Sequence, residues 1–83
     1  MKTITQIKTK IASLRKANGP GMIHAEFNSQ IGMLEDLITF SDHDVLKQLN
    51  FTESELKRYI KENNQCGIIF TKGSLKSLKW YMK

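Results

Sequence analysis

The sequence predicts a mainly α-helical protein that forms one small domain over residues 1–83. Three observations support this fold class. Aliphatic residues recur at helical spacing in the first forty residues, serine and threonine residues stand where helices would begin, and only the short segment 67–71 has the composition of a strand. We therefore expect an antiparallel helical hairpin, a helix-turn-helix-like pair, a short strand near 67–71 and a short C-terminal helix.

The predicted hairpin consists of two helices in the first half of the chain. The first begins at Thr3 or Thr5 and ends at 18–21, where the sequence Asn-Gly-Pro-Gly cannot continue a helix. Its aliphatic stripe consists of Ile4, Ile7, Ile11 and Leu14. The second helix is expected from about Met22 to Phe40, and the short connection makes the two helices neighbours. Gly32 inside it indicates a close helix crossing or a slight bend.

Two further helices are predicted in the middle of the chain. Ser41 begins the third, with a partial capping box three residues later, and Asn50 ends it. Thr52 begins the fourth, because Glu55 at the third position completes a full capping box. Asn63 and Asn64 supply the stop for this helix.

The C-terminal segment changes its pattern. Residues 67–71 read Gly-Ile-Ile-Phe-Thr, which is β-branched and aromatic and therefore predicts a strand. This strand must pair either within the chain or with a second copy of it, and we favour the second copy. Ser74 is expected to cap a final helix, in which Trp80 and Tyr81 help to seal an interface or the core.

Charge is segregated along the chain, whose net charge is +5. Residues 1–20 have five basic residues and no acid, residues 21–56 have seven acids and one lysine, and residues 57–83 have seven basic residues and one acid. The three blocks therefore carry +5, −6 and +6. The basic ends favour a phosphate-rich or anionic partner, and the acidic middle could pair with the basic ends of a neighbouring copy. The alternative interpretation is that these are the solvated faces of ordinary helices.

No pattern in the sequence predicts catalysis, a cofactor or a metal site. His24 and His43 have no cysteine or second histidine at the spacing of metal ligands. Cys66 has no CxxC partner, and a lone cysteine fits a reducing compartment. The adjacent Glu35 and Asp36 diverge on a helix, which is typical of a solvated face. Without a signal-peptide pattern or a membrane-spanning run, we expect a non-enzymatic cytoplasmic protein.

The third and fourth predicted helices resemble a helix-turn-helix over residues 42–61. The resemblance depends on an apolar residue, a turning asparagine and a second set of spaced apolar residues, namely Leu49, Asn50, Phe51, Leu56 and Ile60. It implies binding to DNA or RNA. The basic residues that would contact nucleic acid are Lys57, Arg58, Lys61, Lys72, Lys76 and Lys79.

A protein partner would instead contact the first helix and the terminal aromatic residues. This candidate set consists of Ile4, Ile7, Lys8, Ile11, Leu14, Arg15, Trp80 and Tyr81. We rank a protein partner first, nucleic acid second, and the first helix lying on an anionic membrane third. Because so short a chain has a thin core, we also expect a homo-oligomer.

The chain as a whole is lysine- and asparagine-rich, with few arginines and no catalytic motif. In this character it is similar to small accessory proteins of T-even-type phages. The resemblance implies a regulator or inhibitor that binds a host or phage protein in the host cytoplasm, regulating lysis or countering host defence. In that group, a lysis-inhibition accessory protein would bind the cytoplasmic part of a holin, and an RNA-binding toxin inhibitor would contact RNA and a ribonuclease toxin.

Overall fold

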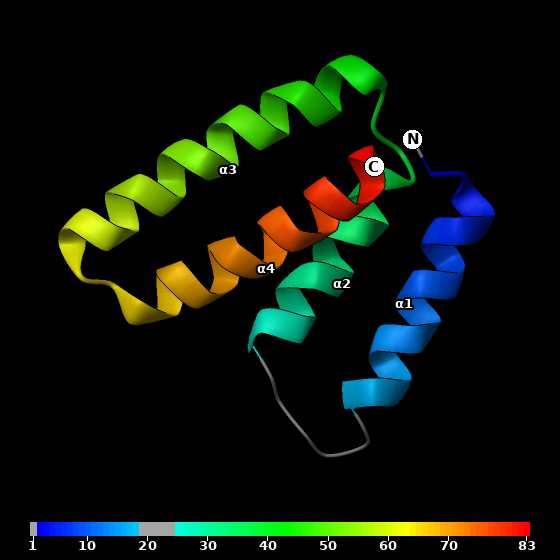
Figure 1. Ribbon diagram of the computed structural model, residues 1–83, viewed down its shortest axis with the longest axis horizontal. Coiled ribbons are helices and arrows are strands. Elements are labelled where there is room, and N and C mark those ends of the chain that lie inside the picture. Colours follow the sequence, from blue (N-terminus) through cyan, green and yellow to red (C-terminus); the bar gives the residue numbers. More distant parts are fainter. Residues whose placement is uncertain (1, 19–24) are drawn as a thin grey trace.

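The computed structural model describes residues 2–18 and 25–83, and these residues form four helices (Figure 1). The helices are α1 (Ile4–Asn18), α2 (Ala25–Leu37), α3 (Asp42–Glu62) and α4 (Gln65–Met82). No strand occurs within the described ranges. The mainly α-helical fold class predicted from the sequence is therefore confirmed.

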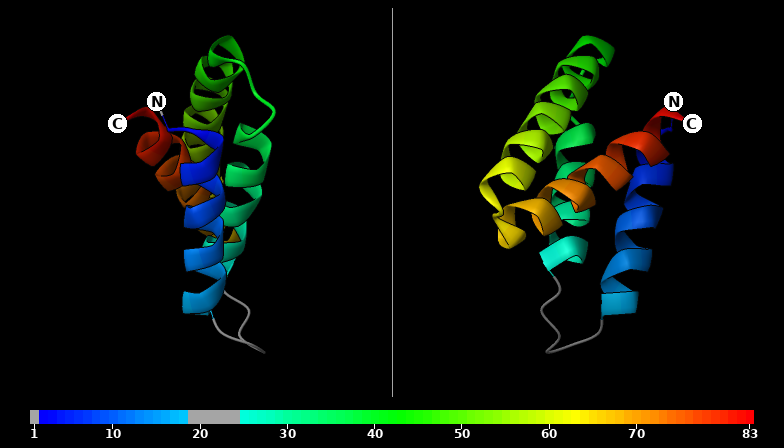
Figure 2. Two further views of the ribbon diagram at one scale, coloured as in Figure 1. Left: turned by 90° about the vertical axis from the view of Figure 1, so that its right-hand side faces the viewer. Right: turned by 60° about the vertical axis from the view of Figure 1, so that its left-hand side comes forward.

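The helices form a slab with principal extents of 37, 36 and 18 Å. Helix α4 packs against both α2 and α3, whereas α1 packs against α2. The views in Figure 2 show α4 crossing over α2, and α1 and α2 running antiparallel beside each other. The predicted helical hairpin is therefore confirmed. Helix α4 packs between this hairpin and α3.

Helix α1 begins as the sequence predicts. The Thr3 hydroxyl oxygen accepts a hydrogen bond from the Gln6 backbone N–H at 3.2 Å, and the Thr3 N–H donates to the Gln6 side-chain carbonyl at 2.8 Å. This reciprocal pair occupies two N–H groups that have no partner inside the helix. The predicted turn at 19–21, the start of the second helix at Met22 and His24 lie outside the described residues.

Small side chains allow α2 and α4 to approach closely. A Cβ atom added at Gly73 would lie 1.8 Å from the Ser29 hydroxyl oxygen and 2.5 Å from the Glu26 carbonyl oxygen. The Ser77 hydroxyl donates to the Gln30 carbonyl oxygen at 2.8 Å, which links the two helices. At Gly32, by contrast, an added Cβ would meet no atom within 4 Å. Of the two explanations that we gave for Gly32, a close crossing is therefore wrong, and the close approach of α2 and α4 is at Gly73.

The start of α3 is also as predicted. The Ser41 hydroxyl oxygen accepts from the Asp44 backbone N–H at 3.3 Å, and the Ser41 N–H donates to the Asp44 carboxylate at 3.2 Å. Hydrogen bonds from the Ser41 backbone and then from its hydroxyl lower the pKa of Asp44 below its ordinary value of 3.8.

The predicted break between a third and a fourth helix is wrong, because α3 is continuous from Asp42 to Glu62. The Thr52 hydroxyl donates to the Gln48 carbonyl oxygen at 2.7 Å, so this side chain bonds back to the preceding turn and caps nothing. The Glu55 carboxylate pairs with Arg58. The residues that resemble a capping box therefore lie inside a helix that Ser41 has already started, and the helix-turn-helix resemblance fails.

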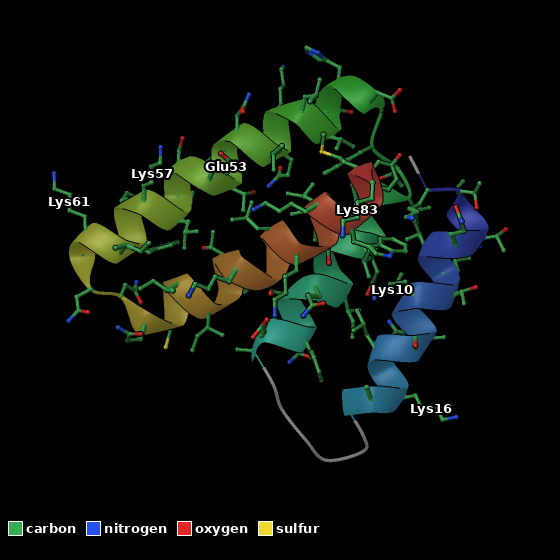
Figure 3. The ribbon with its side chains drawn as sticks, viewed as in Figure 1. Lys10, Lys16, Glu53, Lys57, Lys61 and Lys83 are labelled. Atoms are coloured by element: carbon green, nitrogen blue, oxygen red, sulfur yellow. The ribbon has the colours of Figure 1, made fainter. Side chains whose placement is uncertain are left out.

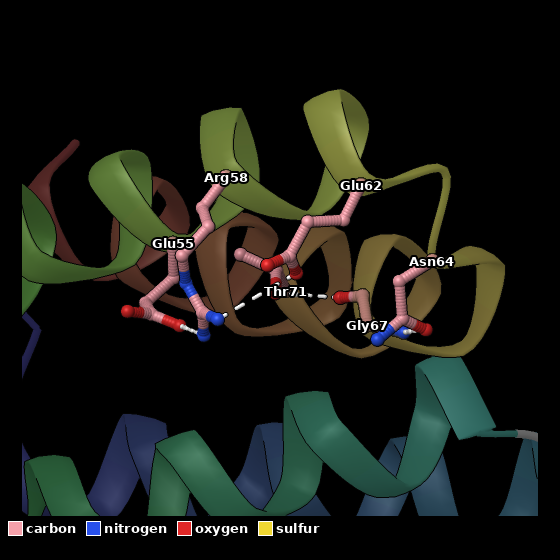
Figure 4. Close-up of polar contacts among 6 residues, drawn as sticks. All are labelled: Glu55, Arg58, Glu62, Asn64, Gly67 and Thr71. Carbon is pink, nitrogen blue, oxygen red and sulfur yellow. Dashed lines mark hydrogen bonds and ion pairs between the residues drawn. The ribbon is translucent and has the colours of Figure 1, made fainter.

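The chain reverses between α3 and α4 at the two asparagines that we predicted as a stop, of which Figure 4 shows Asn64. Asn63 has a left-handed backbone with φ of 56°, and it ends α3. The Asn64 side-chain oxygen then accepts from the Gly67 N–H at 3.1 Å and caps α4. The Tyr59 ring packs on Gly67, where an added Cβ would lie 2.6 Å from ring carbon Cγ.

The predicted strand at 67–71 is wrong, since these residues form the first turns of α4. The Asn64 cap starts the helix just before them, and the Thr71 hydroxyl bonds to the Gly67 carbonyl oxygen at 2.6 Å. Ser74, which we expected to cap a last helix, is buried in the middle of α4. Cys66 is exposed in the first turn of α4. The argument from an unpaired strand to an oligomer no longer applies.

The core lies where α1, α2 and α4 meet. Its buried hydrophobic residues are Ile7, Ile11, Ile31, Met33, Leu34, Leu37, Val45, Leu78 and Tyr81. Of these, only Val45 comes from α3. Helix α3 is therefore attached to the core mainly through α4.

Candidate functional site

A groove of about 520 Å³ lies between α2 and α3, with residues of α4 between them. It forms because α2 and α3 both pack on α4 and leave space beside each other. Its lining residues are Asn28, Ser29, Gly32, Met33, Glu35, Asp36, Gln48, Phe51, Thr52, Glu55, Tyr59, Phe70, Thr71 and Ser74. Short side chains at the buried positions, such as Ser29, Thr71 and Ser74, keep it open. Gly32 contributes no side chain at all.

Two large aromatic side chains of the groove are exposed to solvent. Phe51 on α3 is 60% exposed, and Phe70 on α4 is 57% exposed. Both line the groove, together with the half-buried Tyr59. Exposed aromatic residues around a concavity are the usual anchors of protein interfaces.

The sequence pattern does not identify either phenylalanine as a contact residue for a protein partner. It places Phe51 beside a helix cap and Phe70 in a strand, so neither is assigned to a helical face. In a continuous α3, Val45, Leu49 and Leu56 share the inward stripe and Phe51 falls on another side. An apolar residue away from the stripe is the signal that would have identified it.

The groove has an acidic rim in the last turn of α2. Glu35 and Asp36 both line it, and this turn contains no basic residue. Carboxylates at a helix C-terminus face the negative end of the helix dipole, which costs roughly 0.3–1 kcal/mol each. Arg15 of α1 reaches Glu35 at 3.3 Å, whereas Asp36 has no ion pair with any described residue.

On the α3 side of the groove, Arg58 forms ion pairs with two acidic residues of its own helix (Figure 4). Its guanidinium pairs with Glu55 and, at 3.6 Å, with Glu62. The hydrogen bond and charge of Glu55 raise the pKa of Arg58 above its ordinary value. Arg58 is therefore held within its own helix by two carboxylates and is less available to an external anion.

The residues predicted to contact a protein partner do not form one surface. Ile7, Ile11 and Tyr81 are buried in the core, and Leu14 and Trp80 are partly buried against it. Ile4 is 53% exposed, and Lys8 and Arg15 are exposed beside a shallow second concavity that also includes Glu35. Apart from Ile4, the aliphatic stripe of α1 therefore packs in or against the protein's own core.

The residues predicted to contact nucleic acid separate into two groups. Lys57 and Lys61 extend from α3 away from the other helices (Figure 3). Lys72, Lys76 and Lys79 lie on α4, where Lys76 pairs with Glu26 of α2. This pair and Arg15–Glu35 join the basic ends to the acidic middle within one chain. The two groups do not form the single helix-turn-helix surface that the sequence suggested.

Residues 2–18 and 25–83 contain neither a cluster of metal ligands nor a membrane-spanning helix. Within those ranges, no three histidine, cysteine, aspartate or glutamate side chains are grouped as metal ligands. The described helices include none with the length and apolarity needed to cross a membrane.

Comparison with known proteins gave no match: no protein-family model, no curated protein and no solved structure corresponds to this chain.

Proposed function

We propose that this protein is a non-enzymatic regulator that acts by binding a protein partner in the groove between α2 and α3. The observation that carries the proposal is the exposure of Phe51 and Phe70 at this groove. Covering the exposed part of one such side chain supplies about 1–2 kcal/mol, so two of them could anchor an interface.

The occupant we propose is an amphipathic segment of the partner, with large apolar side chains on one face and basic residues beside them. The apolar face would cover the two phenylalanines. The basic residues would pair with the acidic rim at Glu35 and Asp36, where a cation relieves the unfavourable position of carboxylates at a helix C-terminus.

A random-sequence peptide display library screened on the whole chain tests this proposal, because the screen does not require the partner to be identified first. We expect enriched peptides to have apolar residues at helical spacing and an excess of lysine or arginine. Phe51→Ala and Phe70→Ala should each weaken the best synthetic peptide by about 1–2 kcal/mol or more, measured by fluorescence anisotropy.

The matched controls are Leu46→Ala and Ile60→Ala. These residues are 50% and 57% exposed on α3, but they do not line the groove. We expect both variants to bind the peptide like the unmodified protein. Enrichment of acidic peptides, or equal losses in the control variants, would contradict the proposal.

A further inference from the structure

A second surface, separate from the groove, gathers lysines from both ends of the chain around Trp80. The Lys2 and Lys10 ammonium groups lie 5.3 and 5.6 Å from the centroid of the Trp80 ring. The Lys2 backbone N–H also donates to the Tyr81 carbonyl oxygen at 3.2 Å, which joins the start of the chain to the end of α4. Lys79 and Lys83 flank this point in the sequence.

The exposed side of α4 continues this group of lysines as a row. Lys72, Lys79 and Lys83 are exposed and recur at spacings of seven and four, so they share one face of the helix. Lys76 lies in the same row, with its ammonium paired to Glu26. At a rise of about 1.5 Å per residue, the row extends over roughly 16 Å. In Figure 3, Lys83 is labelled at the end of α4 and Lys10 on the neighbouring α1.

The cluster is not neutralised by the rest of the described chain. Among residues 2–18 and 25–83, Lys2, Lys10, Lys79 and Lys83 form no ion pair. The dipole of α4 favours lysines in its last turn, which accounts for Lys79 and Lys83. It does not account for Lys2 and Lys10, which the fold brings to the same place from the start of the chain and from α1.

We propose that these lysines bind the phosphate backbone of duplex nucleic acid without reading its sequence. Together they are called the lysine face, which consists of Lys2, Lys10, Lys72, Lys76, Lys79 and Lys83. A duplex carries about one charge per 1.7 Å of its axis, so a row of this length meets several phosphates. Lysines contact phosphates as point charges, and this row contains no side chain suited to bidentate base recognition.

Two other anionic partners fit this face less well. A membrane surface would require a continuous apolar face to insert, but most apolar residues of α1 and α4, such as Ile7, Ile11 and Leu78, are in the core. The exposed ones are divided between the two ends of α4, with Ile4 near its last turn and Ile69 and Phe70 in its first turns. A single strand is bound largely by stacking of its bases on aromatic rings. Trp80 is partly buried, and two lysines lie over its ring.

The test is fluorescence anisotropy of the whole chain with labelled mixed-sequence duplexes, one of DNA and one of RNA, between about 50 and 200 mM salt. Binding to either duplex supports the proposal. The duplex that binds more tightly identifies whether the natural ligand is DNA or RNA. The pair Lys79→Gln/Lys83→Gln should lower the magnitude of the log–log salt slope by about 2 and lower affinity roughly 50-fold at about 0.1 M salt, as loss of two phosphate contacts requires. Lys2→Gln/Lys10→Gln should act in the same direction from the other end of the chain.

The matched control is Lys57→Gln/Lys61→Gln, which removes the same charge from the outer face of α3 and should leave the slope unchanged. Circular dichroism verifies that each variant is folded. Equal losses in the α3 and α4 pairs would overturn the proposal, because net charge alone would then explain binding. Tighter binding to poly-glutamate, to phosphatidylserine vesicles or to a single strand would overturn it as well. So would an absence of duplex binding at the lowest salt.

Discussion

Helices α3 and α4 are similar in length, with 21 and 18 residues, but they are used differently by the fold. In α3 only Val45 and Thr52 are buried, whereas seven residues of α4 are. The reason is position, because α4 packs between α2 and α3 and α3 packs mainly on α4. Helical pattern alone therefore does not tell how much of a helix contributes to the core.

The difference bears on the proposed function. Helix α3 has more apolar side chains than the rest of the described chain covers, with Leu46, Phe51 and Ile60 all exposed. Phe51 differs from the other two because it lines the groove. An element that is weakly buried and rich in apolar residues is where a small protein can accept a partner.

The largest contrast between the two helices is expected from leucine truncation. Leu78 of α4 is fully buried, so Leu78→Ala should lower the free energy of unfolding by about 2–5 kcal/mol. Leu46→Ala on α3 should change it by less than about 0.5 kcal/mol, because that side chain is half in water already. Urea denaturation measures both. Similar losses would show that α3 is packed as firmly as α4.

Replacing glycine with alanine at two positions compares the close crossing of α2 and α4 with the open groove between α2 and α3. Gly73→Ala should cost about 1–3 kcal/mol, because its methyl group would overlap Ser29 and the Glu26 carbonyl. Gly32→Ala adds the same methyl group to open space and should stabilise α2 by up to about 1 kcal/mol. Thermal unfolding compares the two variants. A stable Gly73→Ala protein would contradict the close approach of α2 and α4.

Loss of the cap on α3 should have a smaller and more local effect. Ser41→Ala removes the hydroxyl that accepts from Asp44 N–H, which costs about 1 kcal/mol. Amide hydrogen exchange should accelerate in the first turns of α3, while α4 keeps its protection. If exchange rises equally in both helices, they open as one unit and the contrast between them is wrong.

The start of α3 should also respond to acid. The lowered pKa of Asp44 means that the unfolded chain binds the proton more tightly than the folded chain. The stabilisation is therefore present above the ordinary value of 3.8 and is lost as pH falls through the lower folded pKa. A carboxyl NMR titration should give Asp44 a midpoint below 3.8, and Ser41→Ala should move it upward. A midpoint at or above 3.8 would exclude this capping contact.

Signals at helix ends were the part of the fold that the sequence predicted well. Thr3, Ser41 and the Asn63–Asn64 pair act as expected, because each forms hydrogen bonds to its near neighbours. Thr52 followed by Glu55 has the same local pattern, but Thr52 lies in a helix that is already formed. Local sequence does not distinguish these two situations.

The features that the sequence did not predict depend on contacts in the folded chain. Residues 67–71 have strand propensity, yet the Asn64 cap and the packing of Tyr59 on Gly67 place them in a helix. The groove could not be predicted, because it depends on how α2 and α3 are spaced over α4. The lysine face could not be predicted either, since Lys2 and Lys10 reach Trp80 only in the folded chain.

The central claim is that the groove between α2 and α3 holds a protein partner, and Gly32→Trp tests it most directly. Position 32 opens onto the groove with no atom within 4 Å of an added Cβ, so an indole there should fill the groove without disturbing the core. We predict that the variant unfolds within about 1 kcal/mol of the unmodified protein, since the helix tolerates tryptophan better than glycine. It should nevertheless lose binding to the selected basic amphipathic peptide, while Gly32→Ala retains it. A folded Gly32→Trp protein that binds this peptide with unchanged affinity would contradict the claim.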